Sequence, residues 1–289
     1  MKDARVTIAD LKAMKARGER FAMLTAYDYA TARLLDEAGI PALLVGDSFG
    51  MVVLGYDTTL PVTLDDMLHH VKAVVRGTKR ALVVADMPFL TYQVSVEEAL
   101  RNAGKLIQEG GAQAVKVEGG ADVVPTVRRL TSAGIPVMGH LGLTPQSVHQ
   151  FGGFKVQART LEAIEQLIAD AKTLAEAGAF AVVLECIPAP VAKVVTKSLS
   201  IPTIGIGAGP DCDAQVQVIH DLLHLIPGPL PKHAKAYANV GEMIQQAVAQ
   251  YAADVASGTF PTEQESFRLP KGVTPDDVAA LGAAAGGED

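Results

Sequence analysis

The fold is decided by a short stretch near the N-terminus, Ala42-Leu43-Leu44-Val45-Gly46-Asp47-Ser48, in which an apolar run ends abruptly in polar residues. This pattern is typical of a buried parallel strand that carries an acidic residue at its C-terminal end. Similar runs recur at residues 81–86, 114–118, 136–140 and 181–185. In a barrel of parallel strands, the residues at these ends converge on one rim, where chemistry is built. The residues in question are, in chain order, Asp47, Asp86, Glu118, His140 and Glu185.

The rest of the chain repeats a unit of one strand and one helix. Further strands are predicted at residues 21–27, 201–207 and 216–219, and amphipathic helices separate the eight strands. No linker interrupts the series. We therefore predict an α/β protein built as a single (β/α)8 TIM barrel. The alternative, a doubly wound sheet, needs a glycine-rich dinucleotide motif after its first strand, and residues 27–30 read Tyr-Asp-Tyr-Ala instead.

The two ends of the chain are expected to lie outside the repeat. An amphipathic helix is predicted at residues 6–17, before the first strand. Residues 271–289 are rich in alanine, glycine and aspartate, which is typical of a mobile tail. We expect a barrel domain over residues 1–267 and a flexible tail over residues 268–289.

The composition excludes several classes of protein. Hydrophobic residues make up 49% of the 289 residues, but no apolar run reaches the length of about 18 that a membrane span needs, and no signal peptide is evident. Cys186 and Cys212 are too few for a disulfide framework, so both are expected to be reduced in a soluble, cytoplasmic protein. The net charge of −7 comes from interspersed charges and argues against a nucleic-acid surface.

Asp47 and Asp86 end neighbouring predicted strands, so their carboxylates can approach one another. Two carboxylates repel unless a positive charge lies between them, and a divalent cation with oxygen ligands removes that repulsion. Mg²⁺ is the expected ion because few hard ligands are present and water can supply the others. Either residue alone could instead cap a helix or a turn. With Glu118 on the next strand end, the metal site is the favoured interpretation.

Lys116 and Glu118 are two residues apart on one strand and therefore face the same side. If that side is the barrel interior, Lys116 either compensates the charge of Glu118 or holds an anionic substrate, and these two roles are compatible.

Glu185 follows four apolar residues, across the barrel from the aspartate pair. A carboxylate in such a setting suits a general base, and the alternative is an ion pair with a basic residue at the rim. His140 is a candidate substrate-binding residue, although a lone histidine more often binds a backbone carbonyl.

Three other patterns carry weaker signals. His220 and His224 have the spacing of a zinc helix but lack its glutamate. Cys186 follows Glu185 and is expected to face the opposite side, against a helix. The glycines of residues 205–209 could surround a phosphate or let another ligand approach the backbone.

A series of short motifs in fixed order resembles one known family. They are Thr25-Ala26-Tyr27-Asp28, Val45-Gly46-Asp47-Ser48, Ala85-Asp86-Met87-Pro88, Val115-Lys116-Val117-Glu118-Gly119, Met138-Gly139-His140-Leu141-Gly142-Leu143-Thr144-Pro145-Gln146, Leu184-Glu185 and Ile204-Gly205-Ile206-Gly207-Ala208-Gly209. Over residues 7–267 the chain resembles the ketopantoate (3-methyl-2-oxobutanoate) hydroxymethyltransferases of pantothenate biosynthesis. It departs from the family at Ala214 and His224, where the family usually has glycine.

The resemblance implies a (β/α)8 barrel that transfers a hydroxymethyl group from 5,10-methylenetetrahydrofolate to 2-oxoisovalerate and gives ketopantoate. It also implies that the protein forms a homo-oligomer, often a decamer in the family. The implied residue roles are Mg²⁺ ligation by Asp47 and Asp86 with Glu118 as a further member, oxoacid binding by Asp47, Ser48, Asp86 and Lys116, and proton abstraction by Glu185. Two alternatives remain: a barrel of the phosphoenolpyruvate mutase and isocitrate lyase type, whose cysteine motif is not evident here, and a barrel that binds a ligand without turnover.

Overall fold

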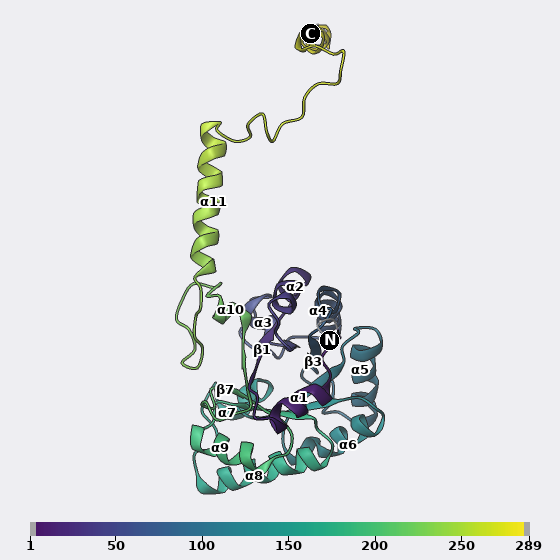
Figure 1. The fold of residues 1–289 in the computed structure, drawn as a ribbon, viewed down its shortest axis with the longest axis vertical. Helices are drawn as coiled ribbons and strands as arrows, with labels where there is room; N and C mark the ends of the chain where they lie inside the picture. The colour runs from purple at the N-terminus through teal and green to yellow at the C-terminus, as the bar shows by residue number, and fades with distance from the viewer. Residues whose placement is uncertain (1–3, 286–289) are drawn as a thin grey trace. The chain divides into compact units, whose positions relative to one another are not determined.

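The computed structural model describes residues 4–285 and contains a closed barrel of eight parallel strands, each paired with the next in chain order and β8 paired with β1 (Figure 1). The predicted (β/α)8 architecture is therefore confirmed. The strands are β1 (Phe21–Thr25), β2 (Ala42–Val45), β3 (Leu82–Asp86), β4 (Ala114–Glu118), β5 (Val137–Gly142), β6 (Ala181–Glu185), β7 (Thr203–Ile206) and β8 (Ala214–Gln217).

Helices follow the strands and cover the outside of the barrel. In α4, for example, Thr63 caps the first turn, and Met67, Val71 and Val74 on one face are fully buried. The helices of this unit are α1 (Ile8–Ala16), α2 (Tyr29–Glu37), α3 (Phe49–Val52), α4 (Leu64–Gly77), α5 (Val96–Gln108), α6 (Val124–Ser132), α7 (Val148–Phe151), α8 (Leu161–Glu176), α9 (Ala189–Ser198) and α10 (Ile219–Leu222), with short 3-10 turns η1 (Ala121–Val123) and η2 (Pro145–Ser147).

Alternate strand residues point into the barrel and form one apolar cluster with Leu11 of α1, which closes the bottom. Lys15 of the same helix forms an ion pair with Asp213, before β8, at 2.8 Å. The same alternation carries Lys116 and Glu118 inward from β4, because Ala114 on that strand belongs to the inner cluster. The inward residues that pack as this cluster include Met23, Ala42, Leu44, Leu82, Val84, Ala114, Met138, Ala181, Val183, Ile204, Ala214 and Val216.

The eighth strand differs from its prediction. It spans Ala214–Gln217 instead of residues 216–219, and Ile219 begins helix α10. Polar Gln215 and Gln217 face away from the interior, so the strand has no continuous apolar run in the sequence. His224, just after α10, has a φ of +47°, a conformation that glycine adopts without strain.

A second compact unit begins at Asn239, so the first unit ends before the predicted boundary at residue 267. The second unit contains α11 (Val240–Ser257) and α12 (Pro275–Ala285). The predicted tail is thus partly helical, since Thr274 and Asp277 form a capping pair at the start of α12. Residues 286–289 of that tail lie outside the described residues. Over the described residues, no helix combines the length and apolar character that crossing a membrane requires.

Asp36 at the end of α2 anchors the loop that enters β3. Its carboxylate accepts hydrogen bonds from the backbone N–H groups of Lys79 (2.9 Å), Arg80 (3.0 Å) and Ala81 (2.6 Å). Burial raises the pKa of Asp36, but these three donors outweigh burial and hold it below its ordinary value.

We expect Asp36→Asn to lower the free energy of unfolding at pH 7 by about 2 kcal/mol, because one amide cannot replace a carboxylate that accepts from three N–H groups. The folded-state pKa is depressed, so this difference is present above about pH 4 and disappears as the pH falls through that pKa. Urea unfolding at several pH values measures it. Glu37→Gln, which removes only an exposed ion pair with Arg33, is the matched control and should cost no more than about 0.5 kcal/mol. Equal effects of the two changes would contradict the anchoring role.

Candidate active site

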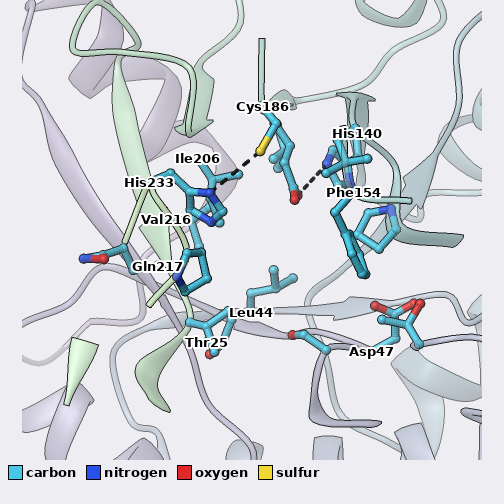
Figure 2. A pocket seen from close by; sticks show the side chains of 18 of the residues that line it. Thr25, Leu44, Asp47, His140, Phe154, Cys186, Ile206, Val216, Gln217 and His233 are labelled. Carbon is cyan, nitrogen blue, oxygen red and sulfur yellow. Dashed lines mark hydrogen bonds and ion pairs between the residues drawn. The ribbon is translucent and has the colours of Figure 1, made fainter. Parts of the chain in front are cut away.

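A cavity of about 600 Å³ opens at the C-terminal ends of the strands (Figure 2). It lies within the first compact unit, and its walls come from strand ends on every side of the barrel. All of the residues predicted for the site line this one cavity: Asp47, Ser48, Asp86, Lys116, Glu118, His140 and Glu185.

The strand register places these residues near one another at the C-terminal ends of neighbouring strands. Asp86 pairs with Lys116 between β3 and β4, and Glu118 pairs with His140 between β4 and β5. Gly142 then pairs with Glu185. Gly142 has a φ of +92°, and a Cβ atom at this position would collide with the carbonyl oxygen of Glu185. Glycine is therefore required beside the predicted base.

Lys116 lies at the centre of a buried group of charges. Its Nζ atom is 2.8 Å from Asp86 Oδ1 and 3.5 Å from Glu118 Oε1, and its side chain is only 4% exposed. Burial lowers the pKa of Lys116, but the carboxylates of Asp86, Glu118 and Asp47 outweigh burial and raise it. The lysine is therefore charged and neutralises part of this carboxylate cluster.

Asp47 and Asp86 lie next to one another on the carboxylate cluster's side of the cavity, connected through the Asp47 backbone. The backbone N–H of Asp47 donates to Asp86 Oδ2 at 3.1 Å, and both side chains are buried. Burial raises the pKa of Asp47, and the charges of Asp86 and Glu118 raise it further. Asp86 Oδ1 is buried without an aligned hydrogen bond. One lysine against three carboxylates leaves excess negative charge, so the oxygen donors here suit a hard divalent cation.

No three His, Cys, Asp or Glu side chains within residues 4–285 form a metal site by themselves. Two adjacent carboxylates can still hold Mg²⁺, which usually keeps several waters or takes ligands from the substrate. The zinc pattern of His220 and His224 gains no third ligand from the described residues either.

His140 lies between the carboxylate cluster and Glu185. Its Nδ1 atom is 3.2 Å from Glu118 Oε1, and its Nε2 atom is 3.2 Å from Glu185 Oε2 without the alignment of a hydrogen bond. Burial and Lys116 lower the pKa of His140, whereas Glu118 and Glu185 outweigh them and raise it to about 9. A charged imidazole has no nitrogen that can accept a hydrogen bond, so His140 cannot accept one from Lys116. Both cations are instead paired with the Glu118 carboxylate. The interpretation that His140 binds a backbone carbonyl is wrong.

Gln146 and Tyr92 support the cluster and were not predicted. The Gln146 side chain donates to Asp47 Oδ2 at 2.9 Å and accepts from the Tyr92 hydroxyl at 2.9 Å, while its backbone N–H donates to Glu118 Oε2 at 3.0 Å. These bonds fix two of the three carboxylates. The position of Gln146 in the motif after His140 was the one available signal, and Tyr92 offered none.

Cys186 faces the cavity, so the prediction that it packs against a helix is wrong. Its φ of +47° breaks the alternation that follows from a regular strand, and its Sγ atom lies 3.8 Å from His233 Nδ1 (Figure 2). Burial raises the pKa of the Cys186 thiol to about 11, and Glu185 adds to this effect. The thiol is therefore protonated and a poor nucleophile near neutral pH.

The family profile of ketopantoate hydroxymethyltransferase matches residues 5–263. The chain belongs to this family. A 3-methyl-2-oxobutanoate hydroxymethyltransferase of Dehalococcoides mccartyi is 61% identical over 269 residues, which cover 93% of this chain and 96% of the relative. The enzyme of that name from Chloroflexus aurantiacus is 56% identical over 285 residues, 99% of this chain and 98% of the relative.

Solved structures with the same fold are more distant in sequence. A phosphonopyruvate hydrolase in complex with oxalate and Mg²⁺ matches with a TM-score of 0.58 and 13% identity, over 96% of this chain and 95% of that one. A 2,3-dimethylmalate lyase of the phosphoenolpyruvate mutase and isocitrate lyase superfamily matches with a TM-score of 0.56 and 18% identity, over 96% and 98%. At this level of sequence identity, the structural likeness supports the barrel fold of this chain. It says nothing about the reaction.

The buried position of Lys116 generates a test of its charge-compensating role. We expect Lys116→Met to lower the free energy of unfolding by about 3 to 5 kcal/mol, because Asp86 and Glu118 lose their buried counter-ion. Lys193→Met, which removes a surface ion pair with Asp211, is the control and should cost at most about 1 kcal/mol. Urea unfolding measures both. Unchanged stability of Lys116→Met would contradict the charge-compensating role.

Proposed function

We propose that this chain transfers a hydroxymethyl group from 5,10-methylenetetrahydrofolate to 3-methyl-2-oxobutanoate (2-oxoisovalerate) and so forms ketopantoate for pantothenate and coenzyme A synthesis. One observation of the structure supports this reaction most directly. Glu185 faces the cluster of Asp47, Asp86 and Lys116 within a single cavity. The cluster suits an anionic oxoacid with a cation, and Glu185 suits removal of a proton from it.

Mg²⁺ is the cation that we propose for this site, with Asp47 and Asp86 as its protein ligands. Both oxygens of Glu118 have protein partners, since Oε2 accepts from Gln146 and Oε1 lies beside Lys116 and His140. Glu118 therefore acts as the further member of the site, which orients its neighbours. When bound, the ion supplies positive charge that stabilises an enolate oxygen.

The residues around the cation bind the oxoacid. Lys116 and His140 both present N–H donors toward the carboxylate cluster, and Ser48 adds a hydroxyl that is 2.9 Å from the Tyr27 hydroxyl. These donors compensate the negative charge of a 2-oxoacid and fix its plane. Lys116 and His140 are buried and already paired with carboxylates, so little reorganisation of these two groups accompanies the reaction.

Glu185 is the proposed base. Its side chain is 15% exposed, and its Oε2 atom lies 3.2 Å from Nε2 of the charged His140, which attracts the carboxylate. Glu185 takes the C3 proton of the oxoacid, and the electron pair of that C–H bond forms the enolate. The enolate carbon then bonds to the methylene carbon of the folate, and both C–N bonds of that carbon break. A water molecule supplies the hydroxyl oxygen of the product, and its two protons together with the proton held by Glu185 go to the new hydroxyl group and the two folate nitrogens. Tetrahydrofolate and ketopantoate leave the site.

The proposal also covers the oligomeric state and the cellular compartment of the protein. Helix α11 exposes an apolar stripe of Met243, Ile244, Val248, Tyr251 and Val255, which suits contact with further copies of the chain in a homo-oligomer, a decamer by family resemblance. Both cysteines are free, which fits the reducing cytoplasm.

The reaction is tested by incubating the purified protein with 2-oxoisovalerate, methylenetetrahydrofolate and Mg²⁺ and detecting ketopantoate by mass spectrometry. Asp47→Asn should lower kcat/KM by about 100-fold and raise the Mg²⁺ concentration needed for half activity, because a carboxylate ligand is lost. Asp57→Asn changes an exposed aspartate outside the cavity and should behave as wild type. An unchanged Mg²⁺ requirement in Asp47→Asn would remove this residue from the metal site.

The variant Glu185→Gln tests whether Glu185 acts as a general base or only as a structural residue. The change keeps the shape of the side chain and removes its basicity, so exchange of the substrate C3 proton in deuterated solvent should fall by about 10² to 10⁴. Loss of an ion pair of roughly 1 kcal/mol accounts for far less. NMR of 2-oxoisovalerate with Mg²⁺ and without folate measures the exchange, with the wild-type rate as reference. Wild-type exchange in the variant would overturn the assignment of Glu185 as the base.

A further inference from the structure

The cavity extends well beyond the carboxylate cluster. Its volume of about 600 Å³ is within the range that encloses a drug-sized ligand, so a five-carbon oxoacid occupies only part of it. Figure 2 shows His233, Val216 and Gln217 on one side of the cavity, and Asp47 with His140 on the other. Residues of β8, α10 and the segment after α10 therefore line a second half of the same cavity.

Glu185 and Cys186 lie between the two halves. Glu185 contacts His140 on the side of the carboxylate cluster, whereas the adjacent Cys186 contacts His233 on the other side. A substrate whose C3 atom is held at Glu185 therefore meets a carbon donor that comes from the half lined by β8. This step rests on the proposed function, since it takes the oxoacid to bind at the cluster.

The second half combines apolar walls and the basic residues Lys232 and His233 with one carboxylate that has no partner. Val216 and Val218 project into it from the β8 end, and Ile206 from β7. Asp221 on α10 is half-buried, and its carboxylate forms no hydrogen bond or ion pair with any residue in the described part of the chain. Burial raises the pKa of Asp221, and His233 lowers it. A half-buried carboxylate without donors is costly, so a ligand that supplies two donors is favoured at this place.

We propose that Asp221 binds the pterin ring of methylenetetrahydrofolate through the two adjacent donors of that ring, the N3–H and the 2-amino group. A carboxylate accepts such a pair in bidentate fashion. The flat ring then packs against Val216 and Val218, which places its one-carbon group toward Glu185. The apolar walls supply binding energy, and Asp221 fixes the orientation of the ring.

The experiment compares binding of tetrahydrofolate and its 2-desamino analogue by isothermal titration calorimetry. Wild type should bind tetrahydrofolate about 10- to 100-fold more tightly than the analogue, because the analogue lacks one donor to Asp221. Asp221→Asn should weaken tetrahydrofolate binding by a similar factor and lose the preference. Its KM for 2-oxoisovalerate and its C3 proton exchange should stay at the wild-type values. Asp211→Asn, which changes an aspartate outside the cavity, is the matched control.

The outcomes separate this inference from the proposed function. Wild-type affinity for tetrahydrofolate in Asp221→Asn overturns the assignment, even where wild type makes ketopantoate. Equal weakening toward tetrahydrofolate and the analogue also overturns it, because a distorted α10 explains that result. A wild-type protein that binds tetrahydrofolate with the expected preference but forms no ketopantoate keeps the pterin site and overturns the proposed reaction.

Discussion

The site depends on one buried lysine held among carboxylates. Strand alternation forces residue 116 into the barrel interior, where Lys116 has Asp86 at 2.8 Å and Glu118 at 3.5 Å. A buried ion pair of this kind contributes little net stability compared with an apolar core, because both charges lose their hydration. Its advantage is chemical, since it fixes charges before a substrate binds. The excess of carboxylates over lysine is the feature on which the proposed cation site rests.

The carboxylates keep their orientation because Gln146 connects separate parts of the barrel. Its side chain bonds to Asp47 after β2 and to the Met87 carbonyl after β3, and its backbone N–H bonds to Glu118 on β4. Tyr92 bonds to the same glutamine. This buried network holds in place the oxygens of Asp47 and Glu118 that it binds.

The parts of the site that follow from strand periodicity could be predicted from the sequence. The period of two placed Lys116 and Glu118 inside the barrel, and the fold class followed from the repeated strand ends. Contacts between residues far apart in the chain could not be predicted, because no local pattern links Tyr92 or Gln146 to the carboxylates. The eighth strand was predicted two residues too late in the chain, because Gln215 and Gln217 interrupt its apolar run. At His224 the chain keeps a glycine-like φ of +47° with a larger side chain.

The backbone conformation of Cys186 explains why the alternation of side chains along β6 ends at Glu185, the proposed base. A φ of +47° in a residue with a side chain costs roughly 1 to 2 kcal/mol, and such strain persists only where neighbouring contacts enforce it. Two backbone hydrogen bonds do so here, from Cys186 N–H to the Ile206 carbonyl at 2.8 Å and from Gln157 N–H to the Cys186 carbonyl at 2.9 Å. The turn lets consecutive residues, Glu185 and Cys186, both face the cavity. A regular strand would leave only one of them there, so the strained residue is what places Glu185 and Cys186 together between the two halves of the cavity.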